Sequence, residues 1–298
     1  MNRYLILLIF MTSSIFGETI HRGKVVEANN SMVVTRHFLA TEIGNNVLQN
    51  GGNAIDASIA ISFALAVVLP QAGNIGGGGF MVIHNQDSNF TIDYREQAPL
   101  LATEKMFITD GLYDPELALE SYQSSGTPGA VAGMYLAHQE FGSIEWKDLI
   151  QPSIDLARNG FIVTKTLEHA LENNIKKLKK YEATRKIFFR HGMTLRAGDR
   201  LIQKDLANTL ELIAINGQDG FYKGRTAQLI EQDMLNNDGL MSQKDLSLYQ
   251  AKMREPIEFT YKDLDVITMP PASSGGLMLA LMLNMIENLE LDNESQSP

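Results

Sequence analysis

The chain has 298 residues, 44% of them hydrophobic, which is enough apolar material for a large core in one domain or two. It carries 25 Lys and Arg against 35 Asp and Glu, and its net charge of −10 argues against nucleic acid or an anionic membrane as the main partner. The absence of cysteine excludes disulfides, thiolate metal sites and a cysteine nucleophile. The six histidines form no HExxH or HxH pair, so we expect neither a metal nor another cofactor.

The first 17 residues have the pattern of a secretory signal peptide. Arg3 precedes an apolar run at 4–11 that is too short to span a bilayer, and the small residues of 12–17 follow it. We therefore expect cleavage after Gly17, export to the periplasm or the medium, and no stable membrane anchor. The remaining residues, 18–298, show no linker and predict one continuous unit of mixed α and β structure.

Two helices are expected before residue 70. The first begins near Ala40 and ends at the glycine pair 51–52. Asn53 can cap the second, over 55–69, and Asp56 lies in its first turn. This second helix is almost wholly apolar and rich in Ala and Ser, which predicts burial on all sides. A short strand at 33–35 would precede both helices.

Residues 73–99 predict a β-hairpin introduced by a glycine run. The glycines at 76–79 require either positive φ or very close approach to a neighbouring backbone. A buried strand at 80–84, a polar turn and a returning strand at 90–94 then deliver Arg95 and Glu96 at the end of the hairpin. The glycine run matches neither GxGxxG nor a P-loop, so a nucleotide site is not expected.

Arg95 has two interpretations on spacing alone. Its guanidinium offers a planar fork of donors that fits a carboxylate ligand bidentately. It could equally form a structural ion pair with Asp93 or Glu96, and surface pairs of that kind are common. The residues themselves leave both interpretations open.

The rest of the chain predicts a loop with short elements at 100–125, followed by helices and a late hairpin. The basic stretch Lys176, Lys177, Lys179 and Lys180 lies within a helical pattern and is most simply a solvated face. No GxSxG nucleophile elbow occurs. The expected helices cover 130–140, 146–159, 167–186, 206–213 and 229–234, the strands 257–261 and 266–269, and a last helix 277–289 after the turn at 270–276.

Seven motifs from about residue 25 to 289 occur in the order found in the N-terminal half of gamma-glutamyltranspeptidases (glutathione hydrolases), which the chain closely resembles. They are HFLATEIGNNVLQNGGNAIDASIA, PQAGNIGGGGFMV, DYREQAP, GTPGAVAGM, QPSIDLARNGF, DLANTLELIAINGQDGFYKG and MPPASSGGLMLALMLNMIE. The resemblance implies the α+β fold of N-terminal-nucleophile hydrolases, an αββα sandwich, of which only the large-subunit part is present. Members of this family cleave themselves once, and the threonine that begins the small subunit becomes the nucleophile. Its own α-amine is the general base for γ-glutamyl transfer from glutathione through an acyl-enzyme.

The resemblance also assigns residues. Arg95 in DYREQAP matches the arginine that binds the α-carboxylate of the glutamyl group, and Glu96 either orients Arg95 or merely pairs with it. We nominate no catalytic residue, because the self-processing threonine pair followed by histidine has no counterpart here. The chain departs from the family at Phe38 and Ala272, where members usually have proline. We expect the chain alone to be inactive, with glutathione or another γ-glutamyl compound as substrate and the missing small-subunit half as partner.

Two other functions remain open. The chain could be a non-catalytic protein that uses Arg95 to capture amino-acid carboxylates, although half of an interleaved fold would expose sheet edges and core faces. It could also belong to a related acylase that acts on another amide, such as a β-lactam side chain. The DYREQAP motif favours a γ-glutamyl donor over that substrate.

Overall fold

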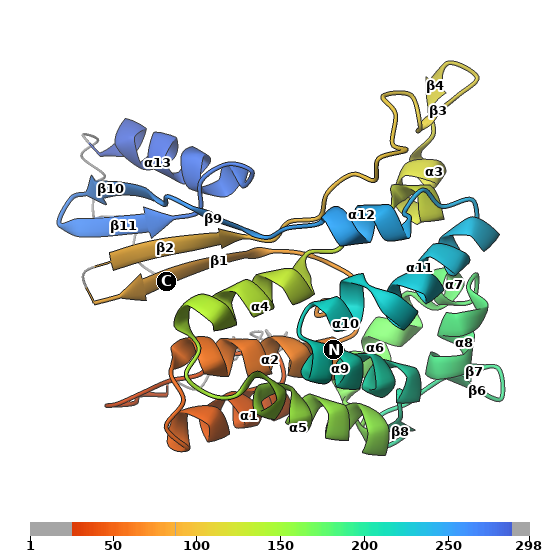
Figure 1. Ribbon diagram of the computed structural model, residues 1–298, viewed down its shortest axis with the longest axis horizontal. Coiled ribbons are helices and arrows are strands. Elements are labelled where there is room, and N and C mark those ends of the chain that lie inside the picture. Colours follow the sequence, from red (N-terminus) through yellow and green to blue (C-terminus); the bar gives the residue numbers. More distant parts are fainter. Residues whose placement is uncertain (1–25, 87, 288–298) are drawn as a thin grey trace, which may run out of the picture. The chain divides into compact units, whose positions relative to one another are not determined.

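A computed structural model describes residues 26–86 and 88–287 (Figure 1). The predicted signal peptide and the last two residues of the helix predicted at 277–289 lie outside the described residues. The chain divides into two units, Met1–Met32 and Val33–Pro298. Residues 26–32 contain no helix or strand, so all the described elements belong to the second unit.

The helices and strands of the second unit follow each other closely along the chain. The helices are α1 (Phe38–Gln49), α2 (Ala54–Val68), α3 (Pro115–Glu120), the 3-10 turn η1 (Tyr122–Ser124), α4 (Ala130–Phe141), α5 (Trp146–Asn159), α6 (Lys165–Asn173), α7 (Ile175–Leu178), α8 (Glu182–Phe188), α9 (Lys204–Asn216), α10 (Asp219–Tyr222), α11 (Gly224–Asn236), α12 (Gln243–Leu248) and α13 (Ser274–Ile286). The strands are β1 (Phe80–Asn85), β2 (Ser88–Asp93), β3 (Ile108–Thr109), β4 (Leu112–Tyr113), β5 (Phe161–Ile162), β6 (Phe189–Arg190), β7 (Met193–Thr194), β8 (Arg200–Leu201), β9 (Lys252–Arg254), β10 (Ile257–Tyr261) and β11 (Leu264–Thr268).

The core is built around α2, which packs against α1, α4 and α5, while α9 packs on the far side of α5 (Figure 1). Small residues along α2 allow these helices to approach closely, and Phe63 and Ile59 fill the space between them, fully buried. The predicted cap is confirmed: the Asn53 side chain accepts from the backbone of Asp56, and the Asp56 carboxylate accepts from the Asn53 N–H. Local sequence therefore determines where the central helix begins.

The main sheet has the antiparallel order β1-β2-β9, and α4 packs against β2. The hairpin register pairs Phe80 with Asp93, which confirms the predicted hairpin and places Arg95 just beyond its end. The prediction that the first strand is buried was wrong. Only Ile83 of β1 is buried and Val82 is 46% exposed, because α4 covers only one face of the hairpin.

Several other expectations were corrected by the structure. Residues 33–35 form no strand. The helix expected at 167–186 is divided into α6, α7 and α8, because Asn174 ends α6 with its side-chain amide bonded to the Ala170 carbonyl at 2.9 Å. The last helix begins at Ser274, three residues earlier than predicted, where the Ser273 hydroxyl accepts from the Gly275 N–H. Strand β9 was missed because three residues give no periodic pattern.

The basic stretch is not simply a solvated face. Lys177 and Lys180 form ion pairs with acidic residues of α3, which lies about 60 residues earlier in the chain. The late hairpin β10–β11 was correctly predicted, and α13 lies against β10 (Figure 1).

Candidate carboxylate-binding site

Arg95 lies two residues after the end of β2, and its guanidinium forms no ion pair with the described residues. Asp93, the last residue of β2, pairs with Arg254 of β9 at 2.7 Å between Oδ2 and Nε. Its other oxygen accepts from the backbone N–H of Arg95 at 3.1 Å. Asp93 is therefore already neutralised, and among the ion pairs of residues 26–86 and 88–287 none includes Arg95 or Glu96. The structure therefore does not contain the alternative ion pair of Arg95 with Asp93 or Glu96.

Glycines bring two segments, the run at 76–79 and the GTPG motif, against the backbone that carries Arg95. Gly79 and Tyr94 exchange backbone hydrogen bonds of 3.2 and 3.0 Å, and a methyl group on Gly78 would overlap the Tyr94 carbonyl. A methyl group on Gly129, from the GTPG motif, would overlap the same carbonyl. Of the two roles predicted for the glycine run, close approach is the one observed, because none of its glycines has positive φ.

Two tyrosines from a distant part of the chain hold the Arg95 backbone and the neighbouring GTPG segment. The hydroxyl of Tyr249 donates to the carbonyl of Arg95 at 2.8 Å, and that of Tyr222 donates to the carbonyl of Pro128 at 2.8 Å. Their rings stack with centroids 5.7 Å apart. Burial raises the pKa of both tyrosines, and the nearby carboxylates of Asp93 and Glu96 add to the effect at Tyr249, so both hydroxyls remain donors at neutral pH.

The Arg95 backbone is further tied on its C-terminal side. Gln97 and Thr127 exchange backbone hydrogen bonds of 3.1 and 2.7 Å. The N–H of Leu100 donates to Asp245, at 2.7 Å, and Asp245 also caps α12. Sequence reasoning missed Tyr222, Tyr249 and Asp245, because isolated tyrosines and a capping aspartate give no sign of a partner so far away in the chain.

Arg95 opens onto a cavity of about 720 Å³. Its polar wall includes Arg95, Glu96, Gln97, Ser124 and Ser125. Its apolar wall includes Ile75, Phe221, Ile230, Met234 and Met241. Arg95 thus lines a cavity with both polar and apolar residues, a combination suited to a small ligand with a carboxylate and a short aliphatic chain.

Over residues 26–86 and 88–287, no three His, Asp or Glu side chains gather as metal ligands would. Within the same ranges, no helix combines the length and the apolar character that crossing a membrane requires.

The fold places the chain in the class of N-terminal-nucleophile hydrolases, as predicted, and the chain carries a part of that fold. The crystal structure of Helicobacter pylori gamma-glutamyltranspeptidase is similar to it, with a TM-score of 0.89 and 42% identity over 92% of this chain and 80% of that chain. The sequence profile of the gamma-glutamyltranspeptidase family matches residues 40–298. The chain therefore belongs to the gamma-glutamyltranspeptidase family.

Curated relatives agree with this assignment. The glutathione hydrolase proenzyme of Escherichia coli (strain K12) is 45% identical over 269 residues, which cover 89% of this chain and 46% of that protein. The acylase ACY 1 proenzyme of Pseudomonas sp. (strain V22) is 36% identical over 277 residues, covering 90% of this chain and 50% of that protein. The chain spans about half the length of the curated relatives it matches.

Proposed function

We propose that this chain is the large-subunit region of an enzyme that transfers the γ-glutamyl group of glutathione and related compounds to water or to an amino acid. The observation that carries the proposal is the guanidinium of Arg95, which lines a cavity while its acidic neighbour Asp93 is engaged by Arg254. An arginine fork binds a carboxylate through two parallel charge-assisted hydrogen bonds. In this proposal Arg95 binds the α-carboxylate of the glutamyl group, and Glu96, which lines the same cavity, orients Arg95.

The nucleophile in this proposal comes from the part of the family's length that the chain does not span. It would be a threonine whose own α-amine takes the proton from its hydroxyl, so that the acyl-enzyme forms without a histidine or a cysteine. Support for such a partner half comes from α13, whose apolar side chains are widely exposed. They include Leu277, Met278, Leu281, Met282 and Met285, which are 46–70% exposed.

The proposed organisation of the gene product is a signal peptide at 1–17 followed by the large-subunit region at 18–298. Export to the periplasm or the medium is part of the same proposal. It is supported by the basic, apolar and small-residue pattern of the first 17 residues.

A second candidate function is that of an amide acylase acting on another acyl group. The similarity to an acylase proenzyme favours it, and the apolar wall of the cavity would suit a simple acyl chain. The two functions differ in the acyl group: a γ-glutamyl group carries an α-carboxylate and an α-amino group, whereas an acyl group such as glutaryl offers Arg95 a carboxylate but has no α-amino group.

The test is the affinity of the full-length gene product for glutamate, measured by titration calorimetry. We expect Arg95→Gln to weaken binding by about 2–4 kcal/mol, roughly 30- to 1,000-fold in Kd, because it removes a charge-assisted bidentate contact. Arg158→Gln is the matched control, since Arg158 forms an exposed pair with Glu211 away from the cavity. Unchanged glutamate affinity in Arg95→Gln would refute the proposal, and glutarate binding as tightly as glutamate would favour the acylase.

A further inference from the structure

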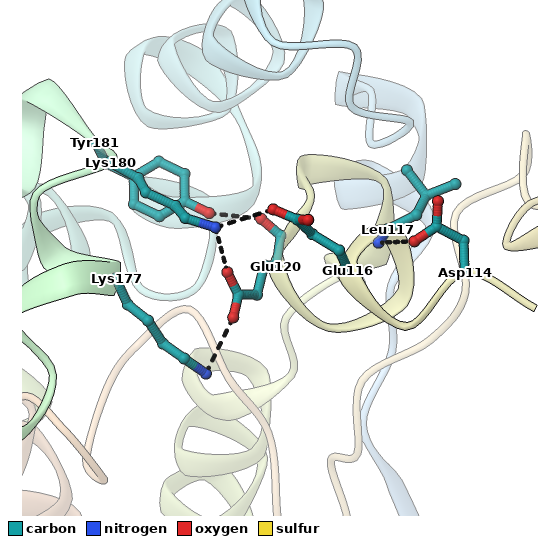
Figure 2. A network of polar contacts seen from close by, with 7 residues as sticks. All are labelled: Asp114, Glu116, Leu117, Glu120, Lys177, Lys180 and Tyr181. Atoms are coloured by element: carbon teal, nitrogen blue, oxygen red, sulfur yellow. Dashed lines mark hydrogen bonds and ion pairs between the residues drawn. The ribbon is translucent and has the colours of Figure 1, made fainter.

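An ion-pair cluster joins α3 to the basic stretch around α7 (Figure 2). The ammonium of Lys180 lies 2.5 Å from Glu120 and 3.1 Å from Glu116, and the ammonium of Lys177 lies 3.3 Å from Glu120. The hydroxyl of Tyr181 donates to the backbone carbonyl of Glu120 at 2.5 Å. This α3 cluster consists of Glu116, Glu120, Lys177, Lys180 and Tyr181.

The α3 cluster ties α3 to the basic stretch, whereas the segment around α3 has no place in the core. None of the residues from 100 to 126 is buried. Leu112 and Leu119 are each 74% exposed, and α3 itself contains no buried residue. Glu120 is the most enclosed carboxylate of the cluster, with a side chain 24% exposed, and hydrogen bonds from Lys180 and Lys177 lower its pKa. Ion pairs and hydrogen bonds therefore hold α3 in place, whereas buried apolar side chains hold the helices of the core.

The cluster is connected to the cavity by a short, hydrogen-bonded path. The turn η1 begins two residues after Glu120, and the Tyr122 ring meets the Tyr181 ring edge-on with centroids 6.0 Å apart. The Ser124 hydroxyl donates to the Ser121 carbonyl at 2.7 Å, and the Ser125 N–H donates to the Tyr122 carbonyl at 3.2 Å. Ser124 and Ser125 then line the cavity beside Arg95.

We propose that the α3 cluster positions the Ser124–Ser125 wall of the Arg95 cavity, so that Lys180 is a positioning residue for ligand binding. The proposal rests on the function proposed above for the cavity. Because residues 100–126 include no buried residue, loss of Lys180 makes the Ser124–Ser125 wall more mobile and leaves the packing of the core unchanged. Exposed ion pairs are screened by salt, so the affinity of the cavity becomes dependent on ionic strength.

The experiment compares Lys180→Gln with Lys186→Gln in the full-length gene product. Lys186 is the matched control, because it forms an exposed ion pair with Glu182 within α8 at 2.6 Å. Its substitution by Gln removes the same positive charge as Lys180→Gln. We expect Lys180→Gln to weaken glutamate binding about threefold to tenfold and Lys186→Gln to leave it within twofold. Lys180→Arg should restore wild-type affinity. Raising the salt to about 1 M, where the Debye length is about 3 Å, should weaken wild-type binding and change the Lys180→Gln variant less.

Hydrogen exchange gives a second readout that needs no ligand. Amide exchange over residues 121–126 should be faster in Lys180→Gln and unchanged in Lys186→Gln. Equal exchange in the two variants would overturn the proposal, as would equal glutamate affinity. A wild-type protein that does not bind glutamate would refute the proposed function instead, and the exchange comparison would then decide the positioning role alone.

Discussion

Gly133, at the end of the first turn of α4, is a position where alanine should destabilise the protein, against the usual preference of helices. A glycine-to-alanine change inside a helix normally stabilises by about 1 kcal/mol, because the unfolded chain loses freedom and the helix gains a better former. At Gly133, however, the added methyl would overlap Cγ of Tyr94 and lie 2.5 Å from its Cβ and Cδ1. These are the inner atoms of the side chain, so a rotation of the ring cannot relieve the overlap.

The size of the effect follows from how firmly Tyr94 is held. Its backbone N–H and carbonyl are both bonded to Gly79, so the strand would have to move away from α4. Overpacking of this kind costs about 1–3 kcal/mol, and an overlap with three inner atoms belongs to the upper part of that range. Subtracting a helix preference of about 1 kcal/mol leaves a net loss of about 1–2 kcal/mol. Because Tyr94 directly precedes Arg95, the same displacement should weaken glutamate binding.

The assay is urea unfolding followed by circular dichroism, with the midpoint compared at an unchanged m-value. Gly275→Ala is the control, since Gly275 is exposed in the first turn of α13 and a methyl there would find Ser273 Oγ at 3.6 Å as its nearest neighbour. We expect Gly275→Ala to be at least as stable as wild type. A Gly133→Ala variant as stable as wild type would show that β2 and α4 are not in the close contact described above.

Two further predictions concern buried titratable groups. Asp56→Asn should lower the free energy of unfolding by about 3 kcal/mol, measured with urea. The reason is that Asp56 is fully buried and accepts from the Ser143 hydroxyl at 2.5 Å and from two backbone N–H groups at 2.9 Å. The control Asp148→Asn, at an exposed position, should lower it by less than about 1 kcal/mol. Burial opposes ionisation of Asp56, but these bonds together lower its pKa, so the difference between wild type and Asp56→Asn should shrink as pH falls below about 4; a constant difference would contradict this. His37 accepts a hydrogen bond from the Leu39 N–H through Nδ1 at the start of α1, and burial lowers its pKa. The unfolded chain therefore binds the proton more tightly than the folded protein does. The free energy of unfolding should then fall as pH drops below about 6.5. His37→Asn keeps a capping side chain and should flatten that part of the unfolding midpoint's pH profile between pH 8 and 5.5, and an equal slope in both proteins would contradict the assignment.

The features that could be predicted from sequence are those whose partners lie close together in the chain. Asn53 and Asp56 are three residues apart, and the hairpin that delivers Arg95 is formed by neighbouring strands, so local chemistry determines both. The apolar period at 206–213 likewise predicted a helix, and α9 covers these residues and ends before Gly217. The position of Arg95 at the end of a hairpin was correct for this reason.

The features that could not be predicted depend on partners far away in the chain. Nothing near Tyr249 indicates that its hydroxyl bonds to Arg95, and nothing near Lys180 distinguishes a cluster-forming lysine from a solvated one. In each case the nearby sequence is compatible both with an exposed side chain and with one bonded to a distant partner, and tertiary contacts decide between the two.

The bonds that hold the Arg95 backbone also determine when the cavity can form during folding. Arg254, Tyr249 and Asp245 reach the hairpin region from 161, 154 and 145 residues further along the chain. Contacts across such long loops close slowly, because the entropy of the intervening chain is lost before the contacts form. During synthesis the hairpin is complete long before Arg254 is added. The cavity therefore acquires its backbone supports only after nearly all of the described chain has been made, which makes ligand binding a late indicator of correct folding.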